Sequence, residues 1–154
     1  MKASGKLDEV DLKLLDRLQD NCLESAETLS QKLGVSRSTI RYRMRKLGEN
    51  GIIEKYYAKA DPSKLGKDYL TVTFVYAKYG PEYHKKLGES LGRIKGVWAV
   101  YFVLGEIDFV VLTRANNRDD YLRILKEMMT MEGIERTSTQ IVLQIIKEDP
   151  KVEM

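Results

Sequence analysis

The sequence predicts an α+β protein of two domains, a helical domain at residues 1–60 and a domain with a four-stranded antiparallel sheet at residues 61–154. Apolar residues recur with helical spacing before about residue 50, and form alternating or continuous β-type runs afterwards. Residues 1–60 hold 12 basic and 9 acidic side chains, whereas residues 61–154 hold 14 of each. The excess of positive charge therefore lies in the helical domain.

Capping residues mark three helices in the first domain. Asp8 can cap a helix that runs to about residue 19, and Ser25 can cap a second, shorter helix. Gly34 ends that helix because glycine takes the left-handed conformation at low steric cost. Ser36 then caps a third helix, and the apolar residues 52 and 53 predict a strand over residues 52–57.

The second domain alternates strands with helices. The expected elements are a strand at residues 69–77, a helix after Pro81, strands at residues 97–104 and 107–113 joined by a tight turn, a helix capped by Asn117, and a last strand at residues 137–146. The order βαββαβ is that of a ferredoxin-like domain, whose antiparallel sheet carries both helices on one face.

The composition excludes several classes of protein. A hydrophobic fraction of 43% with 32% charged residues is typical of a chain that folds in water. The lone Cys22 and the lone His84 give no zinc or iron cluster. The longest apolar run, residues 97–104, is too short to cross a bilayer, and no apolar signal core begins the chain. We therefore expect a cytoplasmic protein without a metal or other cofactor.

The third helix is strongly basic, because residues 36–47 carry five basic side chains and no acid. Two helices, a turn at Gly34 and a basic helix form the arrangement that places a recognition helix in the DNA major groove, in a helix-turn-helix or winged-helix-like domain. If Ile40 points inward, Ser38, Tyr42 and Arg45 point outward. The candidate DNA contacts are Ser36, Arg37, Ser38, Thr39, Arg41, Tyr42, Arg45 and Lys46.

These residues are expected to play different parts. Tyr42 and Arg45 are expected to read base edges, whereas Arg37 should reach phosphates or brace the neighbouring helix. Surface charge usually marks only a solvated helix face. The coincidence of charge, turn and glycine favours DNA binding here.

The strands of the second domain are apolar on both faces. In residues 97–104, for example, Val97, Ala99 and Tyr101 alternate with Trp98 and Val100. Two helices can cover only one face, so a second copy of the domain is the simplest cover for the other. The strand-forming preference of aromatic and β-branched residues explains part of the pattern.

Asp108 is a charge between Ile107 and Phe109, and it needs a partner. From the spacing alone, a ligand contact is about as compatible with this position as a solvated strand end or a turn-capping residue.

With the motifs LSQKLGVSRSTIRYRMRKL, VLGEIDFVV and GIERTSTQIVL, the chain resembles the Lrp/AsnC family of transcriptional regulators over nearly its full length. The resemblance implies a homodimer that assembles into octamers. It also implies a pocket between subunits that takes an amino acid, formed by Gly105, Glu106, Ile107, Asp108, Thr137, Ser138 and Thr139. A symmetric dimer would bind a pseudo-palindromic site in double-stranded DNA.

Two other functions compete with this interpretation. An amino-acid-sensing regulatory subunit of a metabolic enzyme could share the second domain, but the sequence lacks a Gly-rich phosphate loop, and Asp119 and Asp120 are expected to belong to a helix start instead of a catalytic pair. RNA binding by the sheet would need a Gly- and aromatic-rich strand signature, which is missing here. We therefore expect no catalytic residues.

Overall fold

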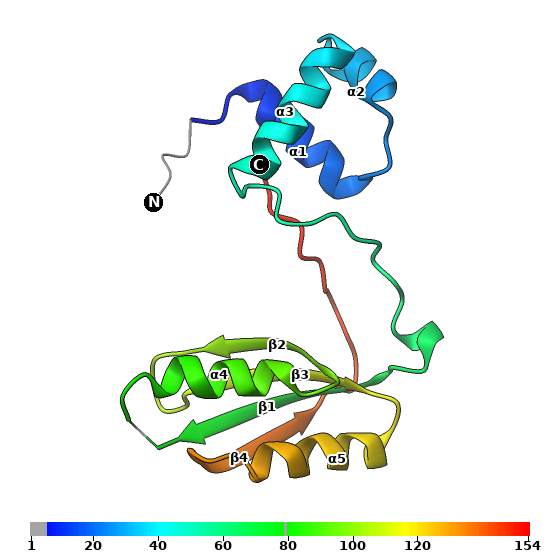
Figure 1. Cartoon of the computed structure of the whole chain (residues 1–154). Coiled ribbons are helices and arrows are strands. Elements are labelled where there is room, and N and C mark those ends of the chain that lie inside the picture. The colour runs from blue at the N-terminus through cyan, green and yellow to red at the C-terminus, as the bar shows by residue number, and fades with distance from the viewer. Residues whose placement is uncertain (1–5, 79) are drawn as a thin grey trace. The chain divides into compact units, whose positions relative to one another are not determined.

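The computed structural model in Figure 1 describes residues 6–78 and 80–154. The chain divides into two compact units. The first holds the residues up to Lys59 together with Glu148–Met154, and the second is Ala60–Lys147. The sequence boundary at residue 61 assigns the last seven residues to the second domain, whereas their contacts place them with the first unit.

Three helices form the first unit: α1 (Glu9–Asp20), α2 (Ala26–Leu33) and α3 (Arg37–Glu49). Each begins at the predicted cap, and Asp8 forms a reciprocal capping box with Asp11. Gly34 ends α2 in the left-handed conformation, with φ of 66°. The core between the helices is apolar and consists of Leu14, Leu15, Leu18, Leu29, Ile40 and Leu47.

The strand expected at residues 52–57 is not formed, which corrects the prediction from sequence. Residues 54–60 have no regular secondary structure and are exposed. A strand needs a neighbour to accept and donate its backbone hydrogen bonds. Among the described residues, none supplies such a partner to residues 54–60.

The second unit is built on one antiparallel sheet, with the strand order β2-β3-β1-β4. Its strands are β1 (Tyr69–Ala77), β2 (Val97–Phe102), β3 (Phe109–Ala115) and β4 (Ile134–Ile141). A short 3-10 helix, η1 (Ser63–Leu65), precedes β1, and the helices α4 (Tyr83–Arg93) and α5 (Arg118–Met129) cover one face of the sheet (Figure 1). This is the predicted ferredoxin-like arrangement.

The last strand begins three residues earlier and ends five residues earlier than predicted. It pairs with β1 from Ala77↔Ile134 to Thr71↔Ile141, and β1 itself begins at Tyr69. Beyond Val142, which donates to the Leu70 carbonyl, the chain has passed the end of its neighbour. The length of β1 therefore sets the end of β4, and residues 143–146 are not strand.

The core side of the sheet is fully packed, and its other side is open. Alternate residues of β1 and β3, among them Val75 and Val111, are buried beneath the helices. Their neighbours on the opposite side, among them Phe74 and Leu112, are half-buried. The apolar second face expected from the sequence is therefore present in the single chain.

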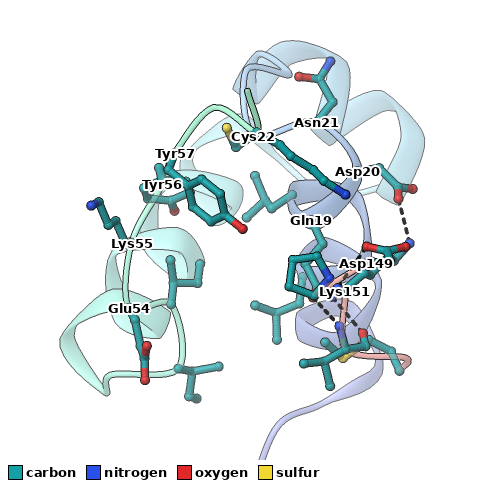
Figure 2. Close-up of a pocket in the computed structure, with 18 of the residues that line it drawn as sticks. Gln19, Asp20, Asn21, Cys22, Glu54, Lys55, Tyr56, Tyr57, Asp149 and Lys151 are labelled. Carbon is teal, nitrogen blue, oxygen red and sulfur yellow. Dashed lines mark hydrogen bonds and ion pairs between the residues drawn. The ribbon is translucent and has the colours of Figure 1, made fainter. Parts of the chain in front are cut away.

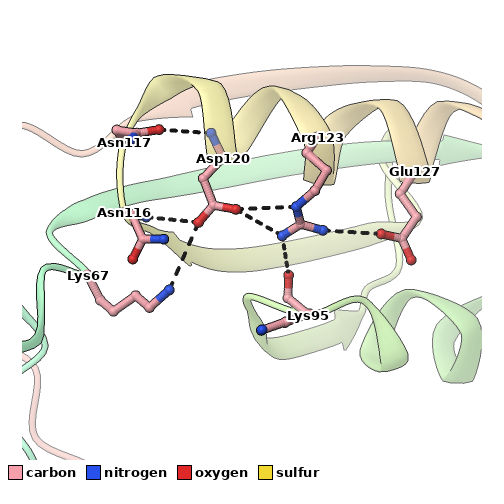
Figure 3. Close-up of polar contacts among 7 residues, drawn as sticks. All are labelled: Lys67, Lys95, Asn116, Asn117, Asp120, Arg123 and Glu127. Atoms are coloured by element: carbon pink, nitrogen blue, oxygen red, sulfur yellow. Dashed lines mark hydrogen bonds and ion pairs between the residues drawn. The ribbon is translucent and has the colours of Figure 1, made fainter.

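The start of α5 is held by a network of polar contacts, shown in Figure 3. Asn117 caps the helix by accepting from the Asp120 N–H. The Asp120 carboxylate accepts from the Asn116 N–H at 3.0 Å and from Arg123, which also donates to the Lys95 carbonyl. The network therefore ties α5 to the turn before β2. These contacts give Asp120 the helix-start role expected from sequence.

The C-terminal residues complete the first unit. Gln19 on α1 exchanges two hydrogen bonds with the backbone of Val152, at 2.8 and 2.9 Å. Lys151 forms ion pairs with Asp16 and Asp20 on the same helix.

Among the described residues, no helix is both long and apolar enough to traverse a membrane.

Candidate functional site

Helix α3 presents one exposed basic face. Ile40 and Leu47 are buried in the core, and this fixes the rotation of the helix. Arg41, Tyr42, Arg45 and Lys46 are consequently exposed, as predicted from the helical spacing. The hydrophobic side of α3 therefore determines which side chains face outward.

Four of the candidate DNA contacts line one shallow hollow of about 270 Å³, namely Ser38, Arg41, Tyr42 and Arg45. Within the hollow, the Arg45 guanidinium lies 5.8 Å from the centre of the Tyr42 ring, a cation–π distance. Arg45 is also 3.8 Å from Glu49 one turn later. Among the residues that the structure describes, no acid lies within ion-pair distance of Arg41 or Lys46.

The first turn of α3 carries three hydroxyl groups. Ser36 Oγ accepts from the Thr39 N–H at 3.1 Å and lies 2.8 Å from the hydroxyls of both Ser38 and Thr39. These side chains lie at the positive end of the helix, where a phosphate oxygen is electrostatically favoured. Ser36 and Ser38 are exposed, and Thr39 is half-buried.

Two arginines of α3 brace neighbouring helices. Arg43 donates to both Asp8 and Asp11 on α1, at 2.7–2.8 Å, and this contact lowers the pKa of Asp8. Arg37 forms an ion pair of 2.6 Å with Glu27 on α2. Of the two roles considered for Arg37 from sequence, the structure shows the bracing contact.

The segment with Gly105, Glu106, Ile107 and Asp108 connects β2 and β3. The sequence predicts a tight turn at residues 105 and 106, but the connection is longer. The hydrogen bond that closes it runs from the Val103 N–H to the Asp108 carbonyl. Residues 104–107 form the connection itself. Gly105 and Glu106 are exposed at its tip, and Ile107 is half-buried.

The Asp108 side chain is buried, with 8% of its surface exposed, and it has partners within the chain. One carboxylate oxygen accepts from the Ala77 N–H at 2.8 Å, and the other accepts from the Tyr83 hydroxyl at 3.0 Å. The charge therefore joins the end of β1 and the start of α4 to the loop. Sequence reasoning did not identify Tyr83 as a partner, because 25 residues separate it from Asp108 and no local spacing links them.

The second candidate ligand segment lies on β4. Thr137 and Thr139 pair with Val75 and Thr73, so their side chains share the helix-covered face, whereas Ser138 points to the open face. The Thr139 hydroxyl is hydrogen-bonded to Thr73 at 3.0 Å and also to Tyr121. Thr139 is thus part of a polar network beneath α5.

The two candidate segments lie at the same end of the sheet. Val75 pairs with Phe109 on one side and with Thr137 on the other. Two strand spacings across β1 separate them by about 10 Å, the length scale of a small ligand. The fold therefore brings residues 105–108 and 137–139 to opposite sides of one strand end.

A larger open groove of about 1120 Å³ lies within the first unit, and no sequence motif predicted it. Figure 2 shows Cys22, Tyr56 and Lys151 among the residues that line it. Its lining comes from α1, from residues 52–59 and from the C-terminal residues, with Leu15 and Leu18 among the apolar members. The groove forms only where residues 52–59 and the C-terminal residues, about 90 positions apart in sequence, meet on α1, which explains why local patterns did not reveal it.

Both parts of the chain match known family models. The AsnC-type helix-turn-helix domain matches residues 7–48, and the Lrp/AsnC ligand binding domain matches residues 71–152. An HTH-type transcriptional regulator of Pyrococcus horikoshii is 36% identical over 147 residues, which are 93% of this chain and 97% of that protein. The HTH-type transcriptional regulator FL11 of the same organism is 34% identical, with coverage of 92% and 93%.

Solved structures share the fold over almost the whole chain. A transcriptional regulator of Neisseria meningitidis in complex with L-Met has a TM-score of 0.88 at 21% identity, with 96% of each chain covered. Escherichia coli AsnC has a TM-score of 0.87 at 23% identity, with 97% of this chain and 100% of that chain covered. The two family models and the relatives of 34–36% identity agree, and this chain belongs to the Lrp/AsnC family of transcriptional regulators, with a helix-turn-helix domain that binds DNA and a ligand-binding domain.

Proposed function

We propose that the protein binds a specific duplex DNA sequence through α3 and responds to an amino acid bound by its second unit. The observation that carries the first part is the shared hollow of Ser38, Arg41, Tyr42 and Arg45. A guanidinium can donate two hydrogen bonds to guanine in the major groove, and the Tyr42 ring beside Arg45 limits the orientations of that side chain. Ser36, Thr39 and Lys46 flank the hollow and are suited to phosphate contacts.

A variant of Arg45 tests this assignment. Arg45→Ala should weaken binding to a duplex selected from a random pool by about 1–3 kcal/mol, or about 5- to 150-fold, and relax the base preference at one position. Lys13→Ala removes an equal charge from the exposed face of α1 and should have little effect. Equal losses on selected and random duplexes for Arg45→Ala would reduce Arg45 to a phosphate contact.

The proposed ligand site comprises residues 105–108 and 137–139. Their position at one end of the sheet supports it, as does the L-Met bound to the neisserial regulator of the same fold. A carboxylate has about four acceptor positions, and the Ala77 and Tyr83 contacts of Asp108 occupy two. Asp108 can therefore still accept from an α-ammonium, while Thr137, Ser138 or backbone N–H groups of the loop meet the carboxylate.

A homodimer built on the open face of the sheet completes the proposal. The centre of that face is apolar, with Phe74, Val110 and Leu112 half-buried. Arginine–aromatic pairs lie at its sides, with Arg114 over Trp98 and Arg136 over Tyr76. An apolar centre with aromatic and arginine side chains is typical of protein interfaces. Two recognition helices related by a two-fold axis would then require a pseudo-palindromic site, and dimers could assemble into octamers.

The enzyme alternative has weaker support. Asp119 and Asp120 lie in the first turn of α5, and the Asp120 carboxylate is engaged with Asn116 and Arg123. The curated relatives reported above are transcriptional regulators. We therefore favour a regulator over a subunit of a metabolic enzyme.

A further inference from the structure

The exposed basic residues of α3 are Arg37, Arg41, Arg45 and Lys46. Arg37 differs from the other three because it forms a short ion pair with an acid of another helix. Its Nη1 atom lies 2.6 Å from Glu27 Oε2 on α2. Arg41 and Lys46 have no acid within ion-pair distance among the described residues, and the contact of Arg45 with Glu49 is longer, at 3.8 Å. Arg43 also pairs with acids outside α3, but its side chain is only 22% exposed. Among the exposed basic residues of α3, Arg37 is thus the one closely paired with an acid from another helix.

The positions of the two residues favour this pairing. Arg37 is the first residue of α3, where the helix dipole disfavours a cation, and the first turn of α3 contains no acid. Glu27 lies in the first turn of α2, where the dipole favours an anion. An acid from α2 therefore offsets a cation that its own helix does not stabilise.

The pair remains accessible to solvent and to DNA. The side chains of Arg37 and Glu27 are 65% and 51% exposed. Moving Arg37 onto a phosphate would leave the Glu27 carboxylate beside the negative DNA backbone. The two charges together add nothing to the net charge of the surface, so they release no counterion when DNA binds.

We propose that Glu27 withholds Arg37 from the DNA backbone and so limits the salt-dependent, sequence-independent part of binding. This inference rests on the proposed DNA contact through α3. Glu27 is a positioning residue, because it acts through Arg37 and makes no DNA contact of its own. The hollow of Ser38, Arg41, Tyr42 and Arg45 then supplies a larger share of the interaction with DNA.

The salt dependence of DNA affinity tests this role. The full-length wild type, Glu27→Gln, Arg37→Gln and the double variant are titrated with a short duplex of random sequence at several salt concentrations, with fluorescence anisotropy as the readout. Each additional phosphate contact changes the slope of log K against log salt by about −0.9, so affinity falls about 3.5-fold further between 50 and 200 mM salt. We expect this steeper slope for Glu27→Gln, once for each DNA-binding unit engaged.

The other variants separate the proposed role from general electrostatics. Arg37→Gln should retain the wild-type slope, and the double variant should return to it. Glu9→Gln is the matched control, because it removes the same charge from a Glu9–Lys13 ion pair of equal length, 2.6 Å, on α1. Its slope should equal that of the wild type. Thermal unfolding of each variant checks that the helices remain folded.

Specific results would overturn the inference. If Arg37→Gln flattens the slope in the wild-type background, Arg37 already contacts a phosphate. If Glu27→Gln steepens the slope equally when Arg37 is absent, the effect is one of net charge. If the wild type binds duplex DNA and Glu27→Gln has the same salt slope as the wild type, only the role of Glu27 is refuted. If the wild type binds no duplex, the proposed function is refuted as well.

Discussion

Removal of the Asp108 carboxylate should separate its structural role from its proposed ligand role. Asp108→Ala deletes both acceptors, and the Ala77 N–H that loses its partner belongs to a buried residue of β1. Tyr83 is half-buried and can donate to water instead. Asp108→Asn keeps one oxygen for Ala77 and turns an amide group toward Tyr83, whose hydroxyl can rotate to accept.

The contacts set the size of the effect. A hydrogen bond to an ionised acceptor contributes about 1.5–3 kcal/mol, and an unpaired buried donor costs about 1–3 kcal/mol. We expect Asp108→Ala to lower the free energy of unfolding of the second unit by about 2–4 kcal/mol. At about 4–8 °C per kcal/mol for a unit of this size, its Tm should fall by about 8–32 °C. For Asp108→Asn we expect the free energy of unfolding to fall by only about 1 kcal/mol, because one strong acceptor remains.

Thermal unfolding and calorimetric titration measure the two roles separately. Differential scanning calorimetry of the full chain gives Tm for each variant, and titration of the wild type with the twenty amino acids identifies the effector. Asp108→Asn should bind that amino acid about 10- to 150-fold more weakly, because a neutral amide cannot form the charged contact with an ammonium. Unchanged affinity in Asp108→Asn would make Asp108 a structural residue only, and unchanged stability in Asp108→Ala would refute the hydrogen-bond reasoning.

Three further predictions concern the second unit. Gly96→Ala should destabilise it by about 2–4 kcal/mol in urea unfolding, because Gly96 has φ of 104° and an added Cβ would lie 2.6 Å from Ile124 Cδ1. The pKa of Asp120 is held below its ordinary value of 3.8, first by the Asn116 N–H bond and then by Arg123, so its contribution to stability should be full above about pH 5 and lost as the pH falls through the lowered pKa. Urea unfolding of wild type and Asp120→Asn against pH should show their difference shrink accordingly. Val110→Arg, on the open sheet face, should convert the proposed dimer to monomer in analytical ultracentrifugation.

Each of these predictions would be contradicted by a specific result, and the glycine substitution also has a control. Gly92→Ala lies on α4, where an added Cβ meets nothing within 4 Å, and should not destabilise. A stable Gly96→Ala would show that the close approach to Ile124 relaxes freely. A difference between wild type and Asp120→Asn that persists unchanged at pH 2 would contradict the assigned pKa direction. A Val110→Arg protein that still sediments as a dimer would place the interface elsewhere.

Local interactions made much of the fold predictable from sequence. Asp8, Ser25 and Ser36 cap helices through contacts with residues three positions away, and Gly34 ends α2 through its own backbone conformation. The rotation of α3 follows from its apolar spacing, so its outward-facing DNA candidates could be chosen without coordinates. In each case the physical cause lies within about one helical turn.

Tertiary structure decided the features whose causes lie far along the chain. The end of β4 follows from the length of β1, and residues 52–57 form no strand because their neighbours in the described chain supply no pairing partner. The turn motif marked Asp108, but only the fold brings Tyr83 and Ala77 to its carboxylate. The basic run likewise marked Arg37, but the packing of α2 against α3 decides that Glu27 neutralises it. Sequence spacing specifies contacts within an element, whereas contacts between elements depend on packing that no local pattern encodes.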